Sequence, residues 1–198
     1  MKQKDIDIHP FIPQEVLNLF ENSYVKWDPS KSGNKYSVSR NKPTIWSDPY
    51  GVDVPLFHEL GHFVLAPLDR LRITDYNFAF PYEGDKWPDL ECELKVTAIE
   101  YNLLKHFKIQ KEWNKLGKRS KKGFSFGLKL QSNGSEESIE IWDFLYGWEN
   151  YRKHFKLTKS QMRTRMHRKF KTHVKKYNYK WFLKEWNHRN KLLVSGKV

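Results

Sequence analysis

Residues 57 to 63 of this chain read FHELGHF, with two histidines four positions apart and a glutamate directly after the first. On a helix, residues i and i+4 share one face, so His58 and His62 can bind one Zn²⁺ through their ring nitrogens. Glu59 can then accept a proton from water without binding the metal. The motif therefore predicts a zinc site with Glu59 as general base. A chance match and a pair of buried, hydrogen-bonded histidines are the two structural alternatives.

A catalytic zinc site also needs a third protein ligand and an open fourth position. An extended HExxHxxGxxH site is excluded, because Leu65 and Leu68 occupy the places of its glycine and last histidine. The third ligand must therefore come from another element. The predicted helix 89–107 offers three acidic candidates, which are Glu91, Glu93 and Glu100.

Helical geometry separates these three acids. At 100° per residue, Glu91 falls with Lys95 and Asn102 on a polar arc that we expect to face solvent. Glu93 and Glu100 fall on the apolar face, where an unpaired charge is costly, so a metal or a basic residue of another element must pair with them. They lie two turns apart, about 10.5 Å along the axis. One of them can bind zinc while the other orients a ligand histidine from behind.

The segments HELGHFVL and ELKVTAIEYNLL, the second beginning 31 residues after His62, resemble the ImmA/IrrE-type zinc metallopeptidases. In that family, HELGH is followed by a helix that carries E-x-x-A-(N/D)-x-F-A. On this overlay Glu93 takes the place of the third zinc ligand. Val96, Thr97 and Glu100 depart from the pattern, at the places of Ala, of Asn or Asp, and of Ala.

The resemblance covers about residues 36–107 and implies a fold and an activity. The fold is α+β, a zincin-like metallopeptidase core with a small sheet and an HExxH helix, followed here by a basic helical C-terminal extension. The activity is hydrolysis of a peptide that lies along an edge strand, for which residues 44–49 are the candidate. Zn²⁺ would act as Lewis acid and Glu59 as base. Tyr82 and Tyr101 are candidates for stabilising the oxyanion.

Local signals predict the elements that must position these residues. Pro13 fits the first turn of a short helix, and Asp53 and Pro55 fit the start of the helix that carries the motif. Residues 27–35 are rich in turn formers and predict a connection, and residues 69–88 predict a loop or an irregular strand. The predicted helices are 13–20, 53–66 and 89–107, and the predicted strands are 36–40 and 44–49, with a hairpin at 124–142.

Charge is distributed unevenly along the chain, whose formal net charge is +13. Residues 151–198 hold 16 of the 36 Lys and Arg residues and a single acid, Glu185. The first 150 residues are therefore at about −2 and the remainder at about +15. We expect two domains, a zincin-like metallopeptidase-type domain at 1–150 and a basic amphipathic helical extension at 151–198.

The extension carries apolar residues at spacings of three to five, which predicts a helix or helix pair docked by this stripe, with its basic face in solvent. Thr158 and Gln161 fit a capping box at a helix start. The stripe consists of Phe155, Met162, Met166, Phe170, Val174, Tyr177, Trp181, Phe182 and Trp186. Its helical period favours core packing over base stacking for most of the aromatic residues.

The basic face indicates nucleic acid as a partner, because Lys and Arg neutralise phosphates. A solvated charged helix and a surface for an acidic protein are the alternatives. The residues expected to contact phosphates are Arg163, Arg165, Arg168, Lys169, Lys171, Lys175, Lys176 and Lys180.

Composition narrows the class of protein. The single cysteine, Cys92, cannot form an internal disulfide, and there is no apolar stretch of the ~18–20 residues that a membrane span needs. We expect a cytoplasmic protein with no membrane partner. The sequence leaves two candidate functions. The first is a zinc-dependent metallopeptidase that cleaves an intracellular protein, for which a protein associated with nucleic acid is a candidate. The second is a non-catalytic nucleic-acid-binding protein with a structural or inactive HExxH site.

Overall fold

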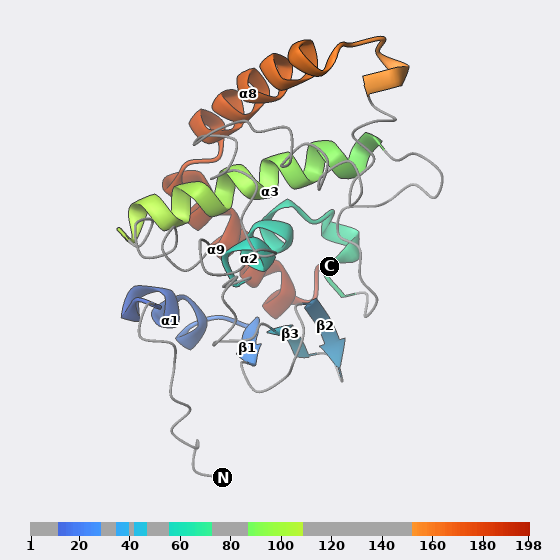
Figure 1. The fold of residues 1–198 in the computed structure, drawn as a ribbon. Helices are drawn as coiled ribbons and strands as arrows, with labels where there is room; N and C mark the ends of the chain where they lie inside the picture. The colour runs from blue at the N-terminus through green and yellow to red at the C-terminus, as the bar shows by residue number, and fades with distance from the viewer. Residues whose placement is uncertain (1–11, 29–34, 40–41, 47–55, 73–86, 109–151) are drawn as a thin grey trace.

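The computed structural model describes residues 12–28, 35–39, 42–46, 56–72, 87–108 and 152–198, and shows an α+β fold (Figure 1). Helices dominate, and one small sheet lies beside them near α1 and α2. The elements are α1 (Gln14–Glu21), β1 (Lys26–Asp28), β2 (Lys35–Ser39), β3 (Lys42–Trp46), α2 (Leu56–Leu65), the 3₁₀ helix η1 (Leu68–Arg70), α3 (Trp87–His106), α8 (Lys159–Lys176) and α9 (Tyr179–Ser195).

The sheet has the strand order β1-β3-β2. β2 pairs antiparallel with β3, as two neighbouring predicted strands would, whereas β1 pairs with β3 in parallel. The prediction of a turn-rich connection over 27–35 was therefore wrong at its start, because β1 extends to Asp28. The prediction of an edge strand at 44–49 was also wrong for residues 44–46, which lie in the central strand.

α2 carries the HExxH motif and is buried on almost all sides. Its apolar residues Leu56, Phe57, Leu60, Phe63 and Val64 are all inaccessible to solvent. The helix contacts α3, α9 and the strands β2 and β3. Such burial restricts the directions of the side chains on the helix, including that of His62.

α3 lies across α2 and is itself covered by α8 on the other side (Figure 1). The expectation that Asn102 projects into solvent was wrong, since its side-chain amide donates to the Val174 and Tyr177 carbonyls at 2.8 Å each. These carbonyls lie at the C-terminal end of α8, where they have no partner within the helix. The polar arc of α3 thus supplies a donor to a neighbouring helix.

The predicted helix pair is present as α8 and α9. The capping box is confirmed. The backbone N–H of Gln161 donates to Thr158 Oγ1, and the backbone N–H of Thr158 donates to Gln161 Oε1. Asn178 caps α9 through a bond from the Trp181 N–H to its side chain. The apolar stripe of α8 is buried at Met162, Met166 and Phe170, as predicted.

α9 packs one face into the hydrophobic core, to which it contributes Phe182, Trp186 and Leu193. The Trp186 ring packs edge-on against Phe20 of α1 and Phe63 of α2, with ring centroids 5.3 and 5.1 Å away. One turn on, Asn190 accepts from Ser23 Oγ and from the Val25 N–H. The described part of the extension therefore shares one core with the helices before it, and the boundary predicted at residue 150 falls within residues that are not described.

Several other expectations fall outside the described residues. These are the Asp53 cap, the hairpin at 124–142 and most of the segment 69–88. Among the helices that the structure describes, none combines the length and the apolar composition needed to cross a bilayer.

Candidate metal centre

Three side chains converge between α2 and α3. His58 Nε2 and His62 Nε2 lie 3.1 Å apart. Glu93 Oε2 lies 3.2 Å from His58 Nε2, and Glu93 Oε1 lies 3.2 Å from His62 Nε2. Ligand atoms about 2.0–2.1 Å from one Zn²⁺ at tetrahedral angles would be about 3.3–3.4 Å apart. The three side chains could therefore hold a metal ion with little movement.

The crossing of the two helices brings these residues together. Gly61 faces α3 so closely that a Cβ on it would lie 3.0 Å from Val96 Cγ1 and 3.3 Å from both Cα and the carbonyl oxygen of Val96. Glycine at this position lets the backbones approach until the Glu93 carboxylate reaches the histidines. Thr97 bonds back to the Glu93 carbonyl at 2.7 Å, within α3.

Each histidine has a second partner behind it on α3. Glu100 Oε2 lies 3.5 Å from His58 Nδ1, and its side chain is 3% exposed. A carboxylate there fixes the orientation of the ring and leaves Nε2 for the metal. The Cys92 side chain lies close enough to His62 to raise its pKa. Glu100 was expected in this role, whereas Cys92 was missed, because a lone cysteine carries no spacing signal.

The shifted pKa values of His58, His62 and Glu93 indicate strong electrostatic interaction among the three groups. Burial lowers the pKa of His62, but the Glu93 carboxylate and Cys92 overcome this effect and raise that pKa to about 10. Burial likewise lowers the pKa of His58, but Glu93 and Glu100 outweigh this effect and raise that pKa well above 6.5. Burial raises the pKa of Glu93, yet the two histidines lower it far below its ordinary value. Protons on the histidines thus compete with a metal, whose binding must release them.

The surroundings of the buried atom Glu93 Oε2 are explained better by a bound metal ion than by protonated histidines. Among the described residues, the buried Glu93 Oε2 has no hydrogen-bond partner of acceptable geometry, although His58 Nε2 lies 3.2 Å away. Two protonated Nε2 atoms 3.1 Å apart would also repel each other. A divalent cation removes both problems, because it takes a lone pair from each of these atoms.

Solvent reaches the cluster from the side of His58. Its side chain is 29% exposed, compared with 11% for His62 and 7% for Glu93. A catalytic site differs from a structural one by an open coordination position. His58 is the most exposed of the three side chains, so any open coordination position is expected on its side.

The remaining predicted site residues lie outside the cluster of ligand atoms or outside the described part of the chain. Glu59 is buried on α2 and lies outside the cluster of ligand atoms. Tyr101 is half-buried, with its ring 6.0 Å from that of Phe170. Tyr82 lies outside the described residues, and Glu91 lies on α3 with a side chain that is not described.

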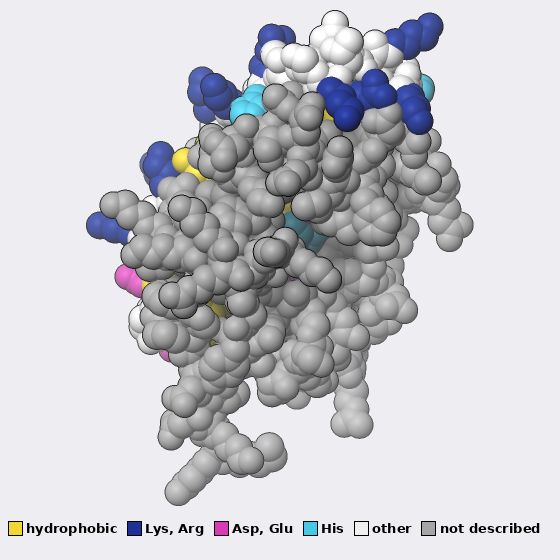
Figure 2. Space-filling view, in the orientation of Figure 1, with side chains coloured by type: hydrophobic (Ala, Val, Ile, Leu, Met, Phe, Trp, Pro, Cys, Tyr) yellow, Lys and Arg dark blue, Asp and Glu magenta, His cyan; other side chains and the backbone are white. Residues whose placement is uncertain are grey.

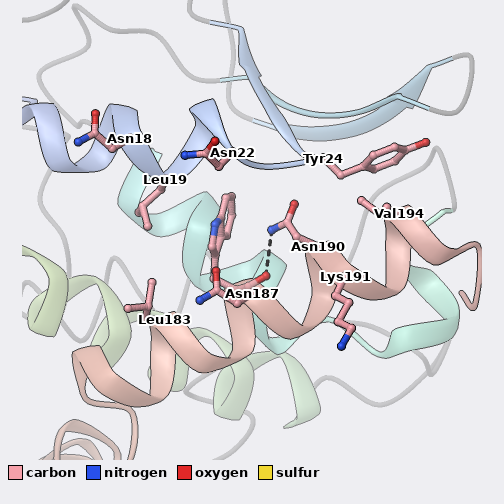
Figure 3. Close-up of a pocket in the computed structure, with 10 residues that line it drawn as sticks. Asn18, Leu19, Asn22, Tyr24, Leu183, Asn187, Asn190, Lys191 and Val194 are labelled. Carbon is pink, nitrogen blue, oxygen red and sulfur yellow. Dashed lines mark hydrogen bonds between the residues drawn. The ribbon is translucent and has the colours of Figure 1, made fainter.

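A pocket of about 500 Å³ lies elsewhere, between α1 and α9 (Figure 3). It includes none of the residues of the metal cluster, so it is not the cleft that serves them. Its polar lining comes chiefly from the side chains of Asn18, Asn22, Asn187 and Asn190.

The predicted phosphate-binding residues lie mainly on α8. Arg168, Lys171, Lys175 and Lys176 are exposed on this helix, and Lys180 is exposed at the start of α9. Arg165 and Lys169 are half-buried, and the Arg165 guanidinium lies 4.7 Å from the centre of the Phe155 ring. The side chain of Arg163 is not described.

Gly61→Ala is expected to weaken metal binding, tested with Zn²⁺ as the probe, and to lower stability by about 1–2 kcal/mol. The new methyl group must push Val96 away, and the cost of overpacking, about 1–3 kcal/mol, exceeds the gain in helix propensity, up to about 1 kcal/mol. Displacement of α3 also carries Glu93 away from the histidines. Zinc titration and urea unfolding measure the two effects.

Val96→Ala provides the control, because it removes the 3.0 Å side-chain contact and leaves the backbone contacts. The double variant should regain part of the lost zinc affinity. Unchanged zinc binding in Gly61→Ala alone would show that the helix spacing does not set the ligand geometry.

Comparison of the chain with protein-family models, with curated proteins and with solved structures found no match.

Proposed function

We propose that this protein is a zinc-dependent metallopeptidase with a zincin-like core. The observation that carries the proposal is the convergence of His58, His62 and Glu93, whose facing atoms lie 3.1–3.2 Å apart. Two imidazoles and one carboxylate form the ligand set of one class of catalytic zinc site. The resemblance to the ImmA/IrrE-type enzymes supports the same ligands and adds the peptide as substrate.

The residues of the chain divide the work among them. When bound, Zn²⁺ supplies Lewis-acid activation of water and of the peptide carbonyl. Glu59 accepts the proton of the attacking water and returns it to the leaving amine, a task that suits a carboxylate beside the ligands. Glu100 holds the His58 ring by Nδ1, so that Nε2 keeps its direction.

The sheet offers an edge for an extended substrate. β2 is an edge strand, and it contacts α2, which carries the motif. A peptide that adds to an edge strand forms main-chain hydrogen bonds along it. We place the substrate there in preference to β3, whose two sides are both paired.

Glu59→Gln is expected to keep zinc and stability while it reduces peptide cleavage by at least about 100-fold. The amide has nearly the shape of the carboxylate but cannot accept the proton, and general-base catalysis contributes about 10²–10⁴-fold. Wild type and variant are incubated, at equal zinc content, with a proteome-derived peptide library. Mass spectrometry then counts the cleavage products.

His58→Ala/His62→Ala serves as the metal-free control, with zinc measured by elemental analysis. We expect one zinc per wild-type chain, none in the control, and cleavage products in the wild-type sample alone. Bound zinc with equal product patterns in wild type and Glu59→Gln would favour a structural metal. An absence of bound zinc from the wild type would refute the metal centre itself.

A further inference from the structure

The outer face of α8 carries a continuous set of positive charges. Met162, Met166 and Phe170 turn inward, and this orientation leaves the basic residues on the opposite side of the helix. Figure 2 shows Lys and Arg side chains along the part of the molecule that α8 forms. We call these residues the α8 basic face: Arg168, Lys171, Lys175 and Lys176.

Acidic residues of the same segment do not compensate these charges. From Arg152 to Lys184 the sequence contains no Asp or Glu. The positive region continues to the contact between α3 and α8, because Lys95 of α3 lies close enough to His173 to act on it together with Lys169 and Lys176. Burial first, and then these lysines, lower the pKa of His173 to about 4. The imidazole thus stays neutral beside a concentrated positive charge.

We propose that the α8 basic face binds the phosphate backbone of a nucleic acid. α8 has 18 residues, which corresponds to a length of about 27 Å. One strand of a duplex presents a phosphate about every 3.4 Å along the axis, so about eight phosphates of that strand, which wind around the duplex, fall within this length. Arg168, Lys171 and Lys175 recur at three or four residues, about 5–6 Å apart, along the same side.

A membrane surface fits this face less well. Interfacial helices insert large apolar side chains beside their basic residues. In the part of the chain that the structure describes, the exposed large apolar residues are Leu68, Phe155 and Val194, and none of them lies on α8. The other alternative is an acidic protein segment, for which polyglutamate serves as the probe.

The aromatic residues of α8 and α9 are buried or half-buried, which limits their stacking on bases. Phe170, Tyr177, Phe182 and Trp186 are in the core, so they are not available to stack on bases. Phosphate contacts alone give strong salt dependence and little sequence preference. This inference does not rest on the metal centre, since no residue of the α8 basic face belongs to it.

The test compares two variants of the full chain with equal loss of charge. Arg168→Gln/Lys171→Gln/Lys175→Gln removes three charges from the α8 basic face, and Lys105→Gln/Lys191→Gln/Lys197→Gln removes three exposed charges elsewhere. Binding of a 20-base-pair DNA duplex and of a single-stranded RNA of equal length is measured by fluorescence anisotropy from 50 to 200 mM salt. Polyglutamate and phosphatidylserine vesicles are tested in parallel.

We expect the α8 variant to bind DNA at least about tenfold more weakly, with a salt slope smaller by about three, while the control binds almost as the wild type does. Zinc content and melting temperature should be unchanged in both variants. Equal losses in the two variants would overturn the proposal, because net charge alone would then explain the binding. Tighter binding of polyglutamate or of the vesicles than of either nucleic acid would also overturn it.

Discussion

Glu93→Gln is expected to lower the zinc affinity by more than about 100-fold and to reduce the melting temperature of the zinc-loaded protein. Groups that only orient a ligand cost about 10–100-fold when removed, and Glu93 lies in direct contact with both histidines. A metal that binds only the folded chain stabilises it, so zinc and stability fall together. Elemental analysis and thermal unfolding measure the two effects.

Two further acids of α3 serve as controls. Glu100→Gln should lower stability and weaken zinc binding by about 10–100-fold, with the site still filled at excess zinc, because it acts through His58. Glu91→Gln should change neither property. Zinc loss in Glu91→Gln together with full zinc binding in Glu93→Gln would show that another face of α3 turns toward the metal.

Trp186→Ala is expected to lower the free energy of unfolding by about 3–5 kcal/mol, as large-to-small changes of a buried aromatic ring do. Trp186 is 2% exposed and packs against Phe20, Phe63 and Phe182. The resulting cavity would lie between three helices that are held by different parts of the chain, so they cannot close it easily. Urea unfolding of the full chain gives the value.

Phe155→Ala is the matched control, an aromatic residue of the same extension that is 42% exposed. It should cost less than about 1 kcal/mol, because little buried surface is lost. Equal effects in the two variants would contradict the placement of α9 in the core. With α9 in the core, removal of residues 151–198 is expected to prevent folding. The role of the α8 basic face must therefore be tested by surface substitutions and not by truncation.

Local sequence signals predicted well the helices that carry the candidate metal centre. The HExxH spacing and the apolar neighbours of the motif predict α2, and the 100° period of α3 puts Glu93 and Glu100 on one face. Both acids indeed lie beside His58 in the structure. These predictions succeeded because each depends on residues within one helix.

Contacts between distant segments could not be predicted in this way. β1 has three residues, too few for an alternating pattern, and its partner β3 lies beyond a connection. Asn102 was predicted to face solvent, because nothing in the sequence near it shows that it lies beside the carbonyls at the end of α8 and donates to them. The helical period of the extension predicted that Trp186 is buried, but not that its neighbours would be residues of α1 and α2.

The position of α9 in the core has a consequence for the order of events during synthesis. The apolar side of α2 is complete once Leu65 has been added, yet Trp186 and Leu193, which belong to the same core, follow roughly 120–130 residues later. At about 5–20 residues per second, the ribosome needs about 6–26 s for this stretch. During that time Phe63 and its neighbours lack their final cover, and a nascent chain in this state is a natural client for chaperones.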